Sequence, residues 1–323
     1  MLSPRLQILH RTIKRLLSRG ADVPLANVIY KTHPADVAEI LKAFGAKERA
    51  GVLGACSVKE KQADILGYLP SDLAAQYILS IDVQEATLVL HTVPPDDLSD
   101  ILECMPEDHR DRLLAMMKRS TRTEMEKIGQ YEPSSAGGIM NPRVFSLSRD
   151  TTAAAAIEAL RENHSDLEMV FYVYVINEVD QLLGVVSLRQ LVTTHATTTL
   201  FELMTSEVIS VDPEVDQEEV AKLSGRYGLL AIPVVDKSNK LLGIVTVDDV
   251  IDVMREEATE DILRMAGAGR ELDIGNPWIG NVMQRLPALL AVYVSGLLSY
   301  IVISKLGHAT FREHPLYLSI PHL

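Results

Sequence analysis

The feature that most restricts the fold of this chain of 323 residues is an internal duplication. The phrase Leu-Leu-Gly-hydrophobic-Val occurs at Leu182–Val186 and again, 59 residues later, at Leu241–Val245. Each copy follows a short apolar segment and a polar turn, and precedes a segment with helical spacing. This order predicts a β-hairpin closed by a helix, present twice.

Each copy also has an earlier part. A hydrophobic-Met phrase opens the copies at Ile139–Pro142 and at Leu203–Ser206. A strand, an acidic turn and a helix follow, in VFSLSRDTTAAAAIEAL and in VISVDPEVDQEEVAKL. Both copies therefore predict the order β-α-β-β-α.

The part before the duplication predicts helices rather than strands. A Pro-x-Asp or Pro-Asp-Asp phrase precedes four apolar segments, with proline suited to the first helical position and a carboxylate facing the positive end of the helix dipole. The four phrases are HPAD at 33–36, LPSD at 69–72, PPDD at 94–97 and MPED at 105–108. Several short helices in series predict a superhelical domain over residues 1–131, although the uneven spacing argues against a strict repeat.

The first twenty residues have a separate charge pattern. They contain five Lys and Arg residues and no acid, with leucine and isoleucine between them at helical spacing. Two interpretations stay open. One is a surface helix with one buried face, and the other is a basic helix that docks on an acidic partner.

One apolar segment lies near the other end. Residues 286–304 are nineteen residues without charge, between Arg285 and Lys305. A helix of this length spans about 28 Å, close to the hydrocarbon thickness of a bilayer, whereas a buried core helix is the alternative. We expect a transmembrane helix at 285–306, followed by 307–323, which is too short for a second span. Because no signal sequence precedes it, the bulk of the chain is expected in the cytoplasm.

Charge and composition exclude several classes. The net charge of −13 argues against nucleic-acid binding, and two cysteines cannot form a disulfide framework or a Cys-rich zinc site. We find no nucleophile–base pair, P-loop or His-rich metal motif, so an enzyme is not expected.

Acidic residues concentrate between positions 207 and 261, where fourteen acids and five bases leave a charge of −9. Two carboxylates ~5 Å apart repel by roughly 3 kcal/mol at an effective dielectric constant near 20. This pattern fits either a solvated acidic surface or a site for a hard cation such as Mg²⁺, which binds a few carboxylates and retains waters.

The duplicated phrase resembles a pair of CBS domains. In that family the cleft between the copies often binds an adenine nucleotide through a hydroxyl residue followed three positions later by Asp. The second copy has this pair as Thr246 and Asp249, whereas the first has Ser187 and Gln190. The resemblance therefore implies at most one good site for ATP or another adenine nucleotide, at Thr246 and Asp249.

Four phrases in order resemble the MgtE family of magnesium transporters and channels. They are HPADVAEIL at 33–41, YEPSSAGGIM at 131–140, EEATEDILRMAG at 256–267 and RLPALL at 285–290. The resemblance implies a homodimer in the inner or plasma membrane, multi-pass in the full-length family. In that family cytoplasmic Mg²⁺ bridges the helical domain, the CBS pair and a connecting plug helix, and thereby closes the pore.

Carried over by position, the resemblance implies a set of Mg²⁺ ligands. They are Asp216, Glu218, Asp249, Asp252, Glu257, Glu260 and Asp261, with Asp97 of the helical domain as a weaker candidate. The plug helix is expected at about 271–284. Two departures stand out: Gly228 lies where some relatives carry an acid, and Lys305-Leu306-Gly307 replaces the family's acidic phrase after the first span.

The sequence thus predicts a multidomain α and α/β protein. We expect a helical domain at 1–131, CBS domains at 132–198 and 199–256, a connecting region at 257–284 and one transmembrane helix at 285–306, with the family's remaining pore helices absent. The predicted function is the Mg²⁺-sensing gating region of a magnesium transporter. The alternative is a non-conducting, membrane-tethered CBS module that senses adenine nucleotides.

Overall fold

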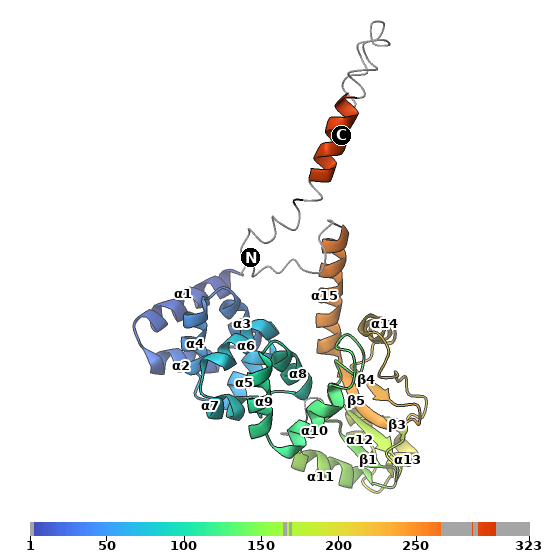
Figure 1. Cartoon of the computed structure of the whole chain (residues 1–323). Helices are drawn as coiled ribbons and strands as arrows, with labels where there is room; N and C mark the ends of the chain where they lie inside the picture. The colour runs from blue at the N-terminus through green and yellow to red at the C-terminus, as the bar shows by residue number, and fades with distance from the viewer. Residues whose placement is uncertain (1–2, 164–166, 168–169, 266–285, 287–289, 302–323) are drawn as a thin grey trace. The chain divides into compact units, whose positions relative to one another are not determined.

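The computed structural model describes residues 3–163, 167, 170–265, 286 and 290–301 (Figure 1). Met1–Met254 form one compact unit, and Arg255–Leu323 form a second.

In the described residues before position 131, ten short helices follow one another. They are α1 (Pro4–Ser18), α2 (Asp22–Lys31), α3 (Pro34–Lys42), α4 (Ala46–Gly54), α5 (Lys59–Gly67), α6 (Ser71–Ser80), α7 (Val83–Leu90), α8 (Pro95–Glu103), α9 (Glu107–Met116) and α10 (Arg119–Ile128).

Most of these helices pack against their next-but-one neighbours. The odd-numbered helices form one row, in which α3 contacts α5, α5 contacts α7 and α7 contacts α9. The even-numbered helices from α4 to α10 form the second row in the same way. Fully buried leucine and isoleucine side chains such as Ile40, Leu53 and Leu90 fill the core of the domain. The serial helix starts thus correctly predicted a domain of short helices in series.

The Pro-Asp phrases mark helix starts as expected. Pro34 and Pro95 take the first helical positions of α3 and α8, and Pro70 and Pro106 are the N-cap residues of α6 and α9. Proline costs little there because the first turn has no intrahelical acceptors for its N–H groups.

The first α/β copy contains β1 (Ser146–Ser148), α11 (Ala153–Asn163), β2 (Tyr172–Ile176), β3 (Leu182–Ser187) and α12 (Leu188–Thr193). The second follows the short helix α13 (Leu200–Leu203) and contains α14 (Gln217–Tyr227), β4 (Ala231–Val235), β5 (Leu241–Thr246) and α15 (Val247–Met265). In the first sheet β1 is parallel to β2 and β2 is antiparallel to β3, whereas β4 and β5 form an antiparallel pair.

The strand expected at the start of the second copy is reduced to one bridge, between Val211 and Val234. In the first copy the N–H of Tyr174 donates to the carbonyl of Phe145, which extends β1. Pro233 takes the position of Tyr174 in the second copy. Because proline has no N–H to donate, the equivalent rung cannot form and the strand does not extend.

The hairpin tips of the two copies pair with each other. Asp180 and Asn239 are the turn residues, both with φ near +60°, a conformation that Asp and Asn tolerate better than most residues. The N–H of Leu182 donates to Asn239 O (2.9 Å), and the N–H of Leu241 donates to Asp180 O (3.0 Å). The tips are thus joined by a reciprocal pair of hydrogen bonds.

The opening methionine of each copy packs on the glycine of the other copy. A Cβ added to Gly184 would lie 2.8 Å from the sulfur of Met204, and one added to Gly243 would lie 2.8 Å from the sulfur of Met140. Each methionine therefore needs a glycine opposite it. The two copies are interlocked rather than merely adjacent.

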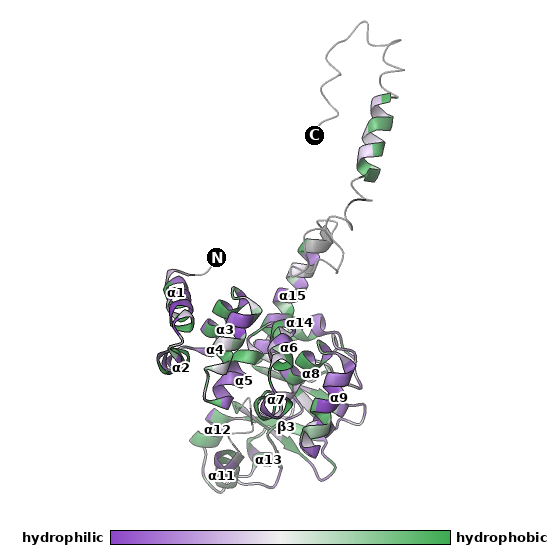
Figure 2. Cartoon of the chain, turned by 60° about the vertical axis from the view of Figure 1, so that its left-hand side comes forward, coloured by the Kyte–Doolittle hydropathy of each residue, from purple (hydrophilic) through white to green (hydrophobic). Residues whose placement is uncertain are grey.

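In the second unit, residues 290–301 are helical and mostly hydrophobic, as the colours of this helix near the C-terminus show in Figure 2. Their large apolar side chains are exposed. No helix among the described residues is both long enough and apolar enough to cross a membrane. The structure therefore does not show the span expected at 285–306, of which it describes 286 and 290–301. The expected plug helix at 271–284 and the segment 307–323 lie outside the described residues.

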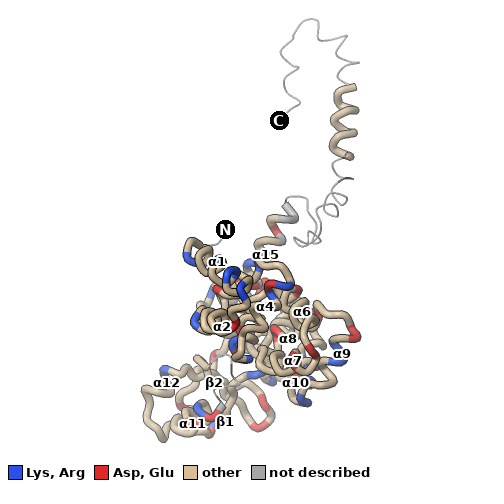
Figure 3. Tube along the Cα trace, turned by 90° about the vertical axis from the view of Figure 1, so that its left-hand side faces the viewer, with Lys and Arg blue, Asp and Glu red and all other residues tan. Residues whose placement is uncertain are grey.

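Charged residues are unevenly distributed over the helical domain. Figure 3 shows Lys and Arg residues on α1, while Asp and Glu residues occur on later helices such as α8 and α9. Some of these acids, such as Asp97 in the first turn of α8, line a cavity together with acids from other helices.

Candidate metal and nucleotide sites

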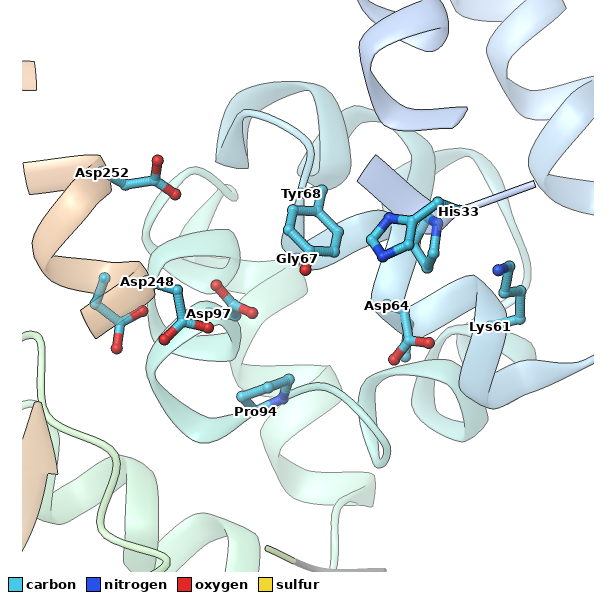
Figure 4. Close-up of a pocket in the computed structure, with 12 residues that line it drawn as sticks. His33, Lys61, Asp64, Gly67, Tyr68, Pro94, Asp97, Asp248 and Asp252 are labelled. Atoms are coloured by element: carbon cyan, nitrogen blue, oxygen red, sulfur yellow. The ribbon is translucent and has the colours of Figure 1, made fainter. Parts of the chain in front are cut away.

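A cavity of about 480 Å³ opens between the helical domain and the start of α15. We call it the acidic cavity because carboxylates line it from three helices. Its lining residues are His33, Pro34, Lys61, Ala63, Asp64, Gly67, Tyr68, Pro94, Asp97, Asp248, Asp249 and Asp252. Figure 4 shows Asp97 and Asp248 projecting into one space from opposite sides, with Tyr68 beside it.

Helix termini position these side chains. Asp97 lies in the first turn of α8, and Asp248 and Asp249 lie in the first turn of α15. Asp249 accepts hydrogen bonds from the N–H and hydroxyl of Thr246, so one of its oxygens caps α15. First-turn carboxylates are favourable for a helix by themselves. What helix capping does not explain is that two such termini meet at one cavity.

Gly67 allows Asp97 to approach α5. A Cβ added to Gly67 would lie 2.6 Å from Asp97 Oδ2, well inside ordinary contact distance. Since Gly67 is the last residue of α5, the carboxylate lies at the negative end of that helix dipole. This placement raises the electrostatic cost of the Asp97 charge and favours a cation in the cavity.

The pKa of Tyr68 reports the negative potential of the cavity. Burial raises the pKa of its phenol, and the charges of Asp248, Asp64, Asp97 and Asp252 raise it further. Burial also raises the pKa of Asp64. Carboxylates from both sides of the cavity therefore act on one ring, although the ring itself is half exposed.

The acidic cavity is suited to a hydrated cation. Within the described ranges, no three His, Cys, Asp or Glu side chains lie close enough together to hold a bare metal ion. Mg²⁺ keeps several of its waters in most protein sites. Carboxylates spread around a cavity of about 480 Å³ can accept hydrogen bonds from those waters, so the residues fit a hydrated Mg²⁺ ion.

Three of the predicted ligands, Asp97, Asp249 and Asp252, meet in the acidic cavity. Asp216 and Glu218 do not line it. Asp216 caps α14 by accepting the N–H of Glu218 (2.8 Å), and Glu218 pairs with Lys222 (2.8 Å).

The predicted ligands of the second unit lie on α15. Asp261 is exposed and Glu257 is partly buried, while the side chain of Glu260 lies outside the described residues.

Sequence reasoning missed other residues of the acidic cavity. Asp248 adjoins a predicted ligand, and His33 belongs to a helix-start phrase, so both had a local signal. Asp64 lies in α5 and Tyr68 follows its last residue, so the packing of α5 within the helical domain brings both to the cavity, and no local phrase of the sequence predicts this.

A second cavity, of about 250 Å³, lies in the cleft between the two α/β copies. It is lined from both copies, by Tyr172, Tyr174, Val185, Ser187, Gln190, Thr205, Glu207, Val208, Ile209, Leu229, Ala231 and Pro233. The predicted nucleotide residues Thr246 and Asp249 do not line it. Thr246 is fully buried, and Asp249 lines the acidic cavity instead.

In the cleft, Ser187 and Gln190 form a capping box on α12. Gln190 Oε1 accepts from the N–H (2.9 Å) and hydroxyl (2.6 Å) of Ser187, and Gln190 Nε2 donates to Leu203 O (3.2 Å). Ser187 and Gln190 therefore form hydrogen bonds to each other and to the protein backbone. Thr246 and Asp249 form the equivalent hydrogen bonds to each other in the second copy.

Comparisons with known protein families divide the chain as the fold does. Residues 32–134 match the MgtE intracellular N domain, and residues 136–196 and 200–256 each match the CBS domain.

Two curated relatives are magnesium transporters. The chain is 36% identical over 306 residues to the magnesium transporter MgtE of Bacillus subtilis, covering 95% of this chain and 68% of that protein. It is 34% identical over 257 residues to the magnesium transporter MgtE of Thermus thermophilus, covering 79% of this chain and 57% of the relative. The chain thus spans between about half and two thirds of these relatives.

Two solved structures share the fold. The cytosolic domain of the Mg²⁺ channel MgtE in complex with ATP is 33% identical, with a TM-score of 0.71 over 76% of this chain and 99% of that one. The soluble part of a magnesium transporter gives the same TM-score at 26% identity, over 78% of this chain and 99% of that one.

Proposed function

The chain belongs to the MgtE family of magnesium transporters, and we propose that its acidic cavity binds Mg²⁺ and holds the transporter closed. The family consists of transporters rather than enzymes. The helical domain and the CBS pair correspond to the cytosolic region of such a transporter. The single observation that carries the proposal is the meeting of Asp97 of α8 with Asp248, Asp249 and Asp252 of α15 in one cavity.

The mechanism follows from charge. Without a cation, carboxylates on the two sides of the acidic cavity repel each other, by roughly 2–3 kcal/mol for a pair 5–8 Å apart at an effective dielectric constant near 20. This repulsion favours separation of α8 from α15. A hydrated Mg²⁺ ion between the two groups of carboxylates attracts both, so the net interaction across the cavity becomes favourable. Because the ion binds the closed arrangement more tightly than the separated one, it shifts the population toward closure.

The same proposal includes the location of the protein, its oligomeric state and its further Mg²⁺ ligands. We place the protein in the plasma membrane as a homodimer, with the helical domain and CBS pair in the cytoplasm and a membrane segment at 285–306. Glu257, Glu260 and Asp261 then act as further Mg²⁺ ligands, as Asp216 and Glu218 do on α14.

Calorimetry and X-ray scattering test the sensing step. Mg²⁺ is titrated into the wild type, Asp97→Asn and the double variant Asp248→Asn/Asp252→Asn. We expect wild-type heat and compaction, and weaker binding in both variants. Asp150→Asn is the control, because Asp150 is exposed and does not line the acidic cavity. An unchanged Mg²⁺ response in both cavity variants would contradict the proposal.

A second candidate function is the sensing of an adenine nucleotide. The cavity of the CBS cleft supports it, since Tyr172 and Tyr174 offer aromatic rings to a base. A relative of known structure is also described in complex with ATP. Titration with ATP and with AMP, in the absence of Mg²⁺, measures this binding separately. Tyr172→Ala should weaken it without changing the Mg²⁺ response.

A further inference from the structure

Helix α1 has a basic surface that the proposed function does not use. The first twenty residues carry a charge of +5 in a chain of −13, so the other residues together carry −18. The four arginines of this segment, Arg5, Arg11, Arg15 and Arg19, are all exposed. We call them, together with Ile8, the basic face of α1.

The opposite face of α1 is committed to the helical domain. Ile13 is fully buried, and Leu6, Leu9, Leu16 and Leu17 pack against the same core. A Cβ on Gly51 of α4 would lie 2.8 Å from the Leu17 side chain, so α1 sits closely on its neighbour. This packing fixes the rotation of the helix. The basic face therefore points away from the domain.

Helical geometry groups the arginines. At about 100° per residue, Arg5, Arg11, Arg15 and Arg19 fall within an arc of about 120°. Ile8 lies within the same arc and is 62% exposed. The fifth base, Lys14, lies outside it and pairs with Glu48 (3.3 Å). Among the described residues, none of the four arginines forms an ion pair.

We infer that the basic face of α1 docks on the anionic headgroups of a phospholipid membrane. Clusters of four or more basic residues on an amphipathic helix bind anionic lipid surfaces, and guanidinium groups pair with phosphate through two hydrogen bonds. The inference rests on the membrane location proposed above, which brings an anionic lipid surface near the domain. The exposed Ile8 at the centre of the charges suits the headgroup region better than it suits a nucleic-acid backbone.

The full chain in vesicles provides the test. Ile8→Cys in a Cys104→Ser background carries a polarity-sensitive fluorophore, since the second cysteine, Cys56, is buried. The protein is reconstituted into vesicles of phosphatidylcholine with increasing fractions of phosphatidylglycerol. We expect a blue shift of the probe that grows with the anionic lipid and disappears in high salt, because exposed charges are screened beyond about 10 Å at 0.1 M.

Two matched variants complete the experiment. Replacing the four arginines of the basic face with glutamine should weaken docking about six-hundredfold, because each basic residue contributes about fivefold near an anionic surface. Four exposed bases elsewhere, Arg112, Lys118, Arg119 and Arg122, are replaced with glutamine as the control and should leave the shift unchanged.

Four results would overturn the inference. They are an equal shift in neutral vesicles, a shift retained without the four arginines, an equal loss in the control variant, and a shift that appears without lipid as protein concentration rises. The last result would indicate docking on the acidic surface of a second copy. Mg²⁺ binding to the acidic cavity is measured in the same samples, so failure of this inference is distinguishable from failure of the proposed function.

Discussion

Replacing Gly67 with alanine should separate the stability of the protein from its response to Mg²⁺. The added Cβ would lie 2.6 Å from Asp97 Oδ2, whereas ordinary contact begins at 3.4 Å. The carboxylate must therefore move by about 0.8 Å. Since only the end of one side chain has to move, the domain should remain folded while the Asp97 carboxylate leaves its place in the acidic cavity.

The two expected effects have opposite signs. Alanine in place of a helical glycine stabilises by up to about 1 kcal/mol, or an increase in Tm of about 2–4 °C. Displacing a carboxylate that binds a metal or its waters weakens metal affinity about tenfold. We therefore expect an unchanged or higher Tm, together with about a tenfold higher Mg²⁺ concentration for half-maximal compaction.

Gly54 provides the matched control. It is the last residue of α4 as Gly67 is of α5, each helix has nine residues, and a Cβ on Gly54 meets nothing within 4 Å. Gly54→Ala should raise Tm similarly without changing the Mg²⁺ response. Thermal unfolding and scattering on the same samples provide both measurements.

A Gly67→Ala variant with wild-type Mg²⁺ affinity would refute the argument that the position of Asp97 matters. The double variant Gly67→Ala/Asp97→Asn adds a second test. Because both substitutions act on one carboxylate, their effects on Mg²⁺ affinity should not add.

Three further predictions concern stability. Burial raises the pKa of Tyr77 to about 12, so wild-type stability should fall as pH rises from about 10 to about 12, because the folded protein holds the phenolic proton more tightly. Tyr77→Phe should reduce that fall in urea unfolding, leaving the part due to other tyrosines of raised pKa such as Tyr68, and should cost about 1 kcal/mol through loss of the hydrogen bond from Gln62. Burial raises the pKa of Asp64, so its charge costs stability once pH passes from the usual pKa of 3.8 through the raised value. Asp64→Asn should remove that fall in a series of denaturation midpoints against pH, and an identical pH profile would contradict the assignment. Arg143 pairs with Glu124 at 2.9 Å, with both side chains about three-quarters buried. Neutralising either should cost about 1 kcal/mol in equilibrium unfolding, and the double variant should cost less than the sum.

The helical domain could be predicted in outline because its signals are local. A proline at the first helical position and an acid two residues later specify where a helix begins, as at Pro34 and Pro95. The two rows of helices agree with a superhelix. How the rows bring Asp64 and Tyr68 to one cavity depends on the packing of α5 against several other helices, which no local pattern encodes.

The duplication predicted the order of strands and helices, but one proline shortened the expected first strand of the second copy to a single bridge. Pro233 removes the N–H that extends the first strand in the other copy, a difference visible in the sequence once the copies are aligned at Tyr174. The candidate site was partly predicted. Asp97, Asp249 and Asp252 meet in the acidic cavity, whereas Asp216 and Glu218 are engaged at α14. The spacing of acids along a chain does not say which helix ends will face each other.

The reciprocal fit of Met140 to Gly243 and of Met204 to Gly184 has an evolutionary consequence. A descendant gene that lost one half of the duplication would encode a single copy in which both contacts are broken. Its glycine would no longer be covered by a methionine, and its own methionine side chain would lose the glycine on which it packs. The halves can drift in sequence, but they must be inherited together.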